Sequence, residues 1–464
     1  MKTLEVEHRT TARVPQDERF GRARDLLGIW FAFNMGPLGL VEGAVGVTLG
    51  LSTVWVIVGL LLGNMLGGLT MAFHAAQGPA LGVPQMLQAR GQFGMRGASV
   101  LTSVQVVVAL GYFVSVLIAS AQSVNRLFPA ISVTTAIFVS IAMSFLITFV
   151  GFRLISAMAK VVAGAIGIFA VILIMAMVMN GSLDSTMLRG GDFKVQSFFL
   201  VVSVAASWQL AWAPDVSDYS RYLPSTTGSR PAFWCTYLGC SLGGALMMIL
   251  GALAAATVSS ADALEGLHTG VGALGAVALV LCVAAAATMN TVNSYSATIC
   301  VVSTYEGFRP VKPLKNSRFV ALGAIYVLAL VLALAGSSNF TTHLITFVYM
   351  CMYVLIPWSA INLADYYIVR HGHYDVQQFF MPHAGIYGDW NKRAGVVFLI
   401  GLAVEVPFMA TELYQGPIAH MLGGIDVAWV VGYVVSFGLY VAIAQRSKSV
   451  TETVRSLDPT LAVE

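Results

Sequence analysis

The sequence predicts an all-α polytopic membrane protein with twelve transmembrane helices. Three observations support this class: the composition, the spacing of apolar runs and the distribution of basic residues. Of the 464 residues, 57% are hydrophobic and only 10% are charged, and the mean hydropathy is +0.79. A soluble domain usually carries about 25% charged residues, so most of the surface of this chain must face lipid. The 45 glycines also fit membrane helices, whose backbones approach closely at small residues.

Apolar runs mark the predicted spans, because a helix needs about 20 mostly apolar residues to cross a bilayer. The predicted spans are 26–49, 53–77, 99–124, 131–150, 158–179, 196–214, 232–257, 271–303, 316–335, 340–369, 394–413 and 425–444. They divide the chain into a cytoplasmic N-terminal segment (1–25), a ten-helix transport core (26–369), a cytoplasmic loop (370–393), two additional helices (394–444) and a cytoplasmic tail (445–464).

The basic residues give this topology an independent test. With the N-terminus in the cytoplasm, 22 of the 25 lysines and arginines fall in cytoplasmic segments or at the cytoplasmic ends of spans, and only Arg126, Arg189 and Lys194 fall outside. Lysine and arginine concentrate on the cytoplasmic side of membrane proteins, and each added or lost crossing would invert every later loop. The pattern therefore predicts a multi-pass protein of the plasma or inner membrane with both termini in the cytoplasm.

The first span contains a predicted break. Within Asn34–Leu40, Pro37 lacks a backbone donor and two glycines weaken the helix. Unwound backbone at membrane depth survives only where it lines a cavity or is buried in protein. We therefore expect a solute or cation site here, beside Glu42; the alternative is a kinked helix whose Glu42 pairs with a neighbouring helix. Glu405, close to Pro407 in the eleventh span, is expected to be structural.

The sixth span ends in Trp208–Pro214, which also holds a proline. Tryptophan offers a ring face and an indole donor, and Gln209 offers a paired donor and acceptor. The alternative for either tryptophan is packing, or an interfacial anchor in the case of Trp212. The first and sixth spans hold matching places in a five-span repeat, 26–179 and 196–369. Two interrupted spans in such places indicate the midplane site of an inverted-repeat transporter.

The eighth span carries a polar cluster in an otherwise apolar helix. Asn290 and Asn293 are three residues apart and share a helix face. A carboxamide can form the paired hydrogen bonds that the edge of a cyclic amide or amidine requires, although hydrogen bonding between helices is the alternative. In the third span, Gln105 and Tyr112 add a polar and an aromatic candidate.

Several motifs resemble one known family. Over nearly the whole of 24–445, the chain is similar to the nucleobase–cation symporter family, purine–cytosine permease type. The motifs are Gly50-Leu51-Ser52, the run Arg90–Gly97, Trp212-Ala213-Pro214, the run Ser217–Pro224 (Ser-Asp-Tyr-Ser-Arg-Tyr-Leu-Pro), the Asn and Tyr cluster of the eighth span, and Ala364-Asp365-Tyr366-Tyr367.

The resemblance implies a LeuT-like fold, a five-plus-five inverted repeat with two extra C-terminal helices, that works by alternating access. It further implies import of a nucleobase, cytosine or a purine, by symport with sodium or protons. Allantoin, hydantoins, uracil and vitamin-like pyrimidines or pyridines are the alternative substrates.

The resemblance also implies roles for individual residues. The substrate-binding candidates are Asn34 and Leu38 in the first span, Tyr112 where several family members have Trp, Trp208 or Gln209 as the ring-stacking position, Trp212, and Asn293 with Asn290 close by. For sodium, the family places backbone carbonyls of the broken first span, here around Gly36, opposite two hydroxyls of the eighth span. Thr288 matches one hydroxyl, but Ala287 occupies the other position. Glu42 provides a titratable group in the same region, so proton coupling is the alternative.

Other functional classes fit less well. A channel would need a continuous polar pore, and only two acidic residues, Glu42 and Glu405, lie deep within the predicted spans, because Asp365, Glu412 and Asp426 fall near span ends. An intramembrane enzyme would need a catalytic or metal-ligand arrangement, and an ATP-driven pump a P-loop; neither pattern is present in the sequence. We therefore expect a transporter that is not an enzyme and has no cofactor. Its expected partners are a small heterocycle and the lipid bilayer, without nucleic acid, and the expected state is a monomer.

Overall fold

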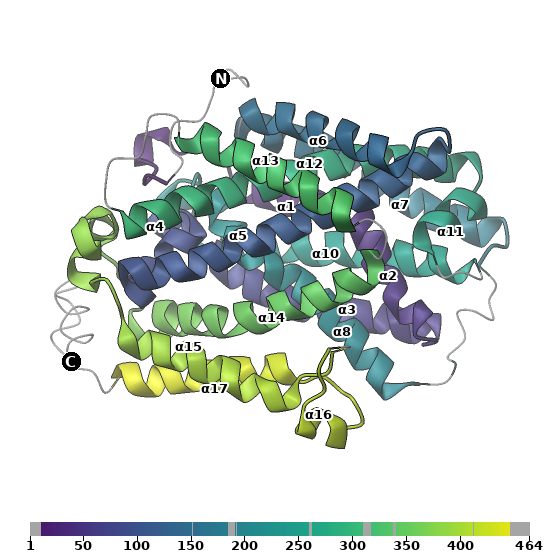
Figure 1. Ribbon diagram of the computed structural model, residues 1–464. Helices are drawn as coiled ribbons and strands as arrows, with labels where there is room; N and C mark the ends of the chain where they lie inside the picture. Colours follow the sequence, from purple (N-terminus) through teal and green to yellow (C-terminus); the bar gives the residue numbers. More distant parts are fainter. Residues whose placement is uncertain are drawn as a thin grey trace.

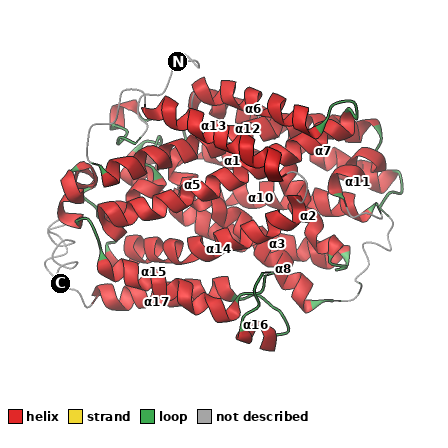
Figure 2. Ribbon diagram, viewed as in Figure 1, coloured by secondary structure: helices red, strands yellow, loops and turns green. Residues whose placement is uncertain are grey.

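The computed structural model of the chain is almost entirely helical (Figure 2). It describes residues 11–150, 152–183, 191, 193–258, 262–309, 317–336, 340–411 and 413–445. Every predicted span overlaps a helix or a pair of helices. Most of the predicted C-terminal tail lies outside the described residues, as do the first ten residues of the N-terminal segment.

The helices of the first half are α1 (Ala23–Phe33), α2 (Pro37–Thr48), α3 (Thr53–Ala75), α4 (Gly78–Leu81), α5 (Gln85–Leu127), α6 (Val133–Val150), α7 (Phe152–Met179), α8 (Val195–Trp212) and α9 (Val216–Ser220). Those of the second half are α10 (Ser229–Ala256), α11 (Ala263–Gly270), α12 (Ala273–Phe308), α13 (Ser317–Gly336), α14 (Phe340–Ala364), α15 (Lys392–Glu405), α16 (Pro417–Met421) and α17 (Ala428–Gln445).

The lengths and surfaces of these helices fit a bilayer. Within the described residues, eight helices are individually long and apolar enough to cross a membrane, and the bent α1–α2 pair is a ninth candidate. Large apolar side chains point outward, such as Leu62 and Met65 on α3 and Val327 on α13. Soluble monomers rarely expose large contiguous apolar faces, so the exposed apolar faces of these helices are suited to lipid.

The first span is broken as predicted. α1 ends at Phe33, α2 begins at Pro37, and the two are bent by 61°. Pro37 occupies the first turn of α2, where its missing N–H has no helical partner to lose. The break therefore lies at Asn34–Gly36, near the middle of the span.

The sixth span differs from the prediction of a second interruption. α8 passes through a single 3-10 turn at Ala213–Asp215 and continues as α9, and residues 195–220 form one apolar span. Pro214 lies in the first turn of that 3-10 segment, and the flanking residues keep right-handed helical angles. The proline therefore tightens the helix without unwinding it.

The helix of the third span, α5, begins at Gln85, earlier than the predicted 99, and it contains a break of its own. Gly94 has φ +78°, and a Cβ there would lie 2.7 Å from the carbonyl of Asp389. The amides of Met95 and Arg96 donate to the carbonyls of Gly388 and Asp389, both at 2.9 Å. The predicted loop 370–393 is thus docked on the transport core, where it satisfies the N–H groups at the start of a helix segment.

The eleventh span is shorter than the predicted 394–413. α15 ends at Glu405, and Pro407 lies in the 3-10 turn that follows. The Glu405 side chain is buried, and a Cβ on Gly432 of α17 would lie 1.8 Å from its Oε1. Glu405 therefore contacts the facing helix of the C-terminal pair.

The helices pack as one bundle around a long α5–α12 contact. In Figure 1, α15 and α17 lie beside α14 along one side of the bundle, and α6 and α13 lie along the other. Large aromatic side chains fill the interior near the α1–α2 break, including Trp30, Phe33, Trp208 and Tyr219, all buried. The broken span is therefore surrounded by protein.

Candidate functional site

Asn34 connects the end of α1 to α8. Its Oδ1 accepts hydrogen bonds from Trp208 Nε1 at 2.5 Å and from Gln209 Nε2 at 3.0 Å. Its Nδ2 donates to the carbonyl of Trp30 at 2.7 Å, which caps the last turn of α1. Three predicted substrate residues, Asn34, Trp208 and Gln209, therefore meet at the break.

Asn34, Gln209 and Asn64 form an amide cluster, against which Gly244 packs. The sequence reasoning missed both Asn64 and Gly244. Gln209 Nε2 also lies 2.7 Å from Asn64 Oδ1 of α3 and 2.9 Å from the carbonyl of Cys240. A Cβ on Gly244 would lie 2.2 Å from Asn64 Oδ1 and 2.4 Å from Gln209 Nε2, so only glycine fits there. Asn64 could have been found as a lone amide in an apolar span, whereas Gly244 gives no signal in the sequence.

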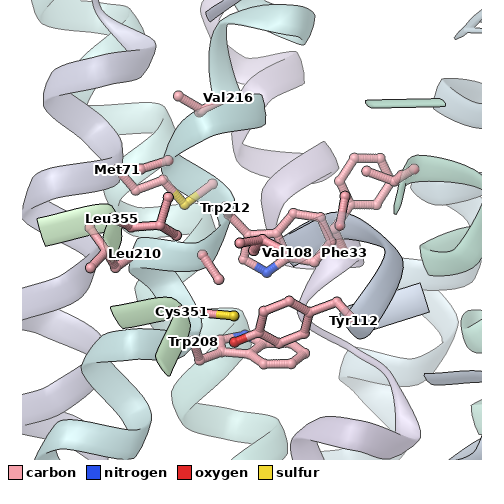
Figure 3. Packing of buried hydrophobic residues seen from close by; sticks show 14 of the residues in the cluster. Phe33, Met71, Val108, Tyr112, Trp208, Leu210, Trp212, Val216, Cys351 and Leu355 are labelled. Carbon is pink, nitrogen blue, oxygen red and sulfur yellow. The ribbon is translucent and has the colours of Figure 1, made fainter. Parts of the chain in front are cut away.

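Aromatic rings lie next to the cluster, and Figure 3 shows those of Phe33, Tyr112, Trp208 and Trp212 close to one another. The rings of Trp208 and Tyr112 are 5.8 Å apart at 76°, and those of Trp208 and Trp212 are 6.2 Å apart at 83°. Trp212 also stacks on Phe33, at 6.3 Å and 24°. Edge-to-face and offset contacts at these distances are favourable for aromatic pairs. The third-span and sixth-span candidates are therefore neighbours, although the sequence separates them by about a hundred residues.

α12 contacts the break through Met289. A Cβ on Gly36 would lie 2.0 Å from Met289 Sδ, and the adjoining Thr288 and Asn290 are buried. Thr288 Oγ1 donates to the carbonyl of Ala284 at 3.3 Å, within its own helix. The two predicted cation positions, Gly36 and Thr288, are therefore close to the same α2–α12 contact.

Many of the predicted site residues hold buried polar atoms without a hydrogen-bond partner among the described residues. These atoms are both carboxylate oxygens of Glu42, the hydroxyl of Tyr112, Oε1 of Gln209, both amide atoms of Asn290 and Nδ2 of Asn293. Buried polar groups are normally paired, and each unpaired one costs about 1–3 kcal/mol. The pairing of Glu42 with a neighbouring helix, the structural alternative, therefore finds no support in these contacts.

Leu38 lies in the same region. It is buried in the first turn of α2 and belongs to the main apolar cluster, together with Trp208 and Tyr112. It adds an apolar side chain next to the break. All the residues predicted to bind substrate or cation thus lie on the helices that surround this break, and their roles as ligands stay predictions.

A second polar group connects α5, the end of the sixth span and α12, and it joins the predicted candidate Gln105 to Asp215, which the sequence reasoning did not single out. Gln105 Nε2 donates to Asp215 Oδ1 at 3.1 Å. Asp218 Oδ1 accepts from the amide of Gln85 at 3.0 Å, and its Oδ2 from Ser296 Oγ at 3.4 Å. Both aspartates are buried. Asp215 follows directly after the predicted end of the sixth span, which is why it was not counted among the intramembrane acids.

Comparison with known proteins assigns the chain to a family. The sequence profile of the family described as "Permease for cytosine/purines, uracil, thiamine, allantoin" matches residues 13–432. The chain belongs to this family, the nucleobase–cation symporters. It is 36% identical over 443 residues to the putative purine-cytosine permease YxlA of Bacillus subtilis, covering 94% of this chain and 95% of the relative. It is 25% identical over 450 residues to the purine-cytosine permease fcyB of Emericella nidulans, covering 93% and 86%.

The solved structures show the same fold. Mhp1, a nucleobase-cation-symport-1 family transporter in a closed conformation with bromovinylhydantoin bound, matches with a TM-score of 0.78 and 18% identity, covering 97% of this chain and all of that chain. The fold class predicted from the sequence is confirmed: a LeuT-like core of ten spans in a five-plus-five inverted repeat, with two further C-terminal spans. This symporter is a multi-pass membrane permease that works by alternating access.

Proposed function

We propose that this symporter imports a planar nitrogen heterocycle, with cytosine or a purine as the first candidates. The observation that carries the proposal is the group of buried polar atoms, unpaired among the described residues, beside the edge-to-face rings of Tyr112 and Trp208 at the α1–α2 break. The relatives named as purine-cytosine permeases support this substrate class. Such bases have two flat faces and an edge of alternating donors and acceptors, which match aromatic rings and carboxamides respectively.

In the proposed complex, the plane of the base packs on Trp208, Tyr112 and Trp212. Asn293, with Asn290 one turn away on α12, pairs with the edge of the base, and Gln209 Oε1 accepts a further hydrogen bond. Asn34 and Leu38 complete the site from the broken span. Among the described residues, both amide atoms of Asn290, Nδ2 of Asn293 and Oε1 of Gln209 are unpaired before binding. Asn34 is already held in place by the cluster, so binding satisfies polar groups that would otherwise remain buried and unpaired.

For the coupling ion, we favour a proton carried by Glu42, with sodium as the alternative. The Glu42 carboxyl is buried, without a hydrogen-bond partner among the described residues, and an unpaired charge at such a place is costly. Protonation removes that cost. Sodium would use oxygen ligands near Gly36 and Thr288, but Ala287 removes one of the two hydroxyls that the family places there.

The topology proposed for the symporter has both termini in the cytoplasm. The distribution of basic residues supports it, because 22 of 25 would lie on that side. We further propose the domain division given above, with residues 26–369 as the transport core, and a monomer as the working unit without nucleic-acid or cofactor partners.

A thermal-shift screen of the purified symporter tests this proposal. Cytosine, adenine, guanine, hypoxanthine, uracil, allantoin and a hydantoin would each be added with and without sodium, at pH 5.5 and 7.5. We expect cytosine or a purine to raise Tm most, and counterflow in proteoliposomes to accelerate uptake of the same labelled base. A screen in which no heterocycle changes Tm, or in which the base emerges chemically altered, would contradict the proposal.

A further inference from the structure

A second cavity lies outside the transport site, at the start of α15 and the end of α17. Its volume is about 390 Å³, and the loop 370–393 closes one side of it. Its walls include Arg370, Lys392 and Arg393, the aromatic residue Trp390, and Ile443 of α17. Among the residues that the structure describes, three basic residues and no acidic residue line it, so this part of its wall favours an anion.

Arg370 provides the most specific feature of this cavity. Only 5% of the residue is exposed, and its Nε donates to Asp365 Oδ2 at 3.1 Å. Asp365 also accepts hydrogen bonds from the hydroxyls of Tyr374 and Tyr440, the latter at 2.8 Å. This carboxylate is thus shared among three donors, and Nη1 of Arg370 has no hydrogen-bond partner among the described residues. A buried guanidinium nitrogen in this state favours an anionic oxygen.

The first turn of α15 adds a second anion-favouring element. The 14-residue helix begins at Lys392, at the wall of the cavity, and Asn391 caps it by accepting from the amides of Arg393 and Ala394. The N-terminus of a helix carries a partial positive charge and attracts phosphate groups. Two side-chain cations, the buried guanidinium and this helix end therefore converge on one space.

The surroundings of the cavity indicate that its ligand comes from the bilayer. Trp390 and Ile386 at its rim are 54% and 53% exposed, as is common for interfacial anchors. From the rim, exposed apolar side chains continue along α15 at Val396 and Leu399, which are 52% and 63% exposed. A phosphate group in the cavity could thus extend into acyl chains along the outer face of this helix.

We propose that this cavity binds the phosphate headgroup of an anionic phospholipid. In the proposed orientation it opens to the cytoplasmic leaflet, where anionic lipids gather and where basic pockets between membrane helices bind their headgroups. The bound lipid stabilises the loop 370–393 in its docked position on the break of α5 at Gly94. This ligand is distinct from the transported base, and its binding is expected whichever heterocycle is transported.

Thermal shift in a neutral detergent tests the proposal on the full-length symporter. Dioctanoyl phosphatidylglycerol is the probe, with dioctanoyl phosphatidylcholine and inorganic phosphate as the comparison arms. We expect phosphatidylglycerol alone to raise Tm. An equal shift with inorganic phosphate would overturn the assignment to a lipid, and an equal shift with phosphatidylcholine would overturn the assignment to an anionic headgroup.

Two variants then test whether phosphatidylglycerol binds in this cavity. The double variant Lys392→Gln/Arg393→Gln should weaken phosphatidylglycerol binding roughly 30-fold, from about 1 kcal/mol per basic residue. Both side chains are exposed, so folding should be retained. Its control, Arg24→Gln/Arg230→Gln, removes two exposed charges from the starts of α1 and α10 and should bind normally.

The second variant, Ile443→Trp, fills the cavity while it keeps every charge, and it should also lose binding. If Ile443→Trp binds phosphatidylglycerol normally, the cavity is not the binding site. The same conclusion would follow if Lys392→Gln/Arg393→Gln and its control lost phosphatidylglycerol binding equally. Throughout, base-dependent thermal shifts of the same samples report on the transport site separately.

Discussion

Replacing Gly244 by alanine is expected to weaken base binding indirectly. Gly244 has no side chain with which to contact the base, but it packs against the amides of Asn64 and Gln209. The added Cβ would lie 2.2 Å from Asn64 Oδ1 and 2.4 Å from Gln209 Nε2, whereas an ordinary contact needs about 3.4 Å or more. The two amides must therefore retreat by about 1 Å. That movement breaks the Gln209–Asn64 and Gln209–Asn34 hydrogen bonds, now 2.7 and 3.0 Å long.

The energetic consequence can be estimated from these contacts. Overpacking of a close-packed interior costs about 1–3 kcal/mol, and hydrogen bonds between membrane helices contribute about 0.6–1.7 kcal/mol each. We expect a lower Tm and a Kd for the base that is roughly 10-fold higher, because Trp208 and Asn34 are no longer held in place. The assays are thermal unfolding in detergent and labelled-base binding by scintillation proximity.

A matched control is Gly323→Ala on α13. A Cβ at Gly323 meets nothing within 4 Å, so this variant should keep the Kd of the wild type and gain slightly in helix stability. Gly244→Ala with the Kd and uptake of the wild type would refute the reasoning that the amide cluster positions the site. An equal loss of base affinity in Gly244→Ala and Gly323→Ala would show that the loss does not depend on contact with the amide cluster.

Three further predictions concern the polar groups of the site. Asn293→Ala should abolish heterocycle uptake while Tm and expression stay near those of the wild type, and Asn180→Ala, at an exposed position, should leave uptake unchanged; uptake by Asn293→Ala at near wild-type affinity would remove Asn293 from the site. If Glu42 carries the coupling proton, Glu42→Gln should retain binding but lose the stimulation of uptake by an inwardly directed pH gradient, and a retained pH response would exclude it as the carrier. If sodium is the coupling ion instead, Thr288→Ala should raise the sodium concentration needed for half-maximal uptake by roughly 10-fold, whereas under proton coupling the sodium response of the two proteins should not differ.

The class of the protein and the position of the broken span could be predicted because both depend on local sequence. Apolar runs report burial in lipid directly, and a proline flanked by glycines disfavours a continuous helix wherever it stands. Pro214 shows the limit of this rule. The same residue type leaves the sixth span continuous, because it lies in the first turn of a 3-10 segment where no helical donor is lost.

The contacts that shape the site could not be predicted, because they join residues far apart in the chain. Gln209 bonds to Asn34 and Asn64, which precede it by 175 and 145 positions. The sequence marks each amide as unusual in an apolar helix but does not say which helices are neighbours. Gly244 is less visible still, since one glycine among 45 acquires meaning only from the two amides that cover it.

The docking of residues 388–391 on the break in α5 has a consequence for the order in which the chain matures. The amides of Met95 and Arg96 are satisfied by carbonyls near position 389, and Asn391 lies 299 positions beyond its partner Gln92. Synthesis runs from the N-terminus at about 5–20 residues per second, so the third span enters the membrane well before its cap is made. The amides of Met95 and Arg96 therefore stay without these carbonyl partners until the ribosome has synthesised residues 388–391, which follow the tenth span.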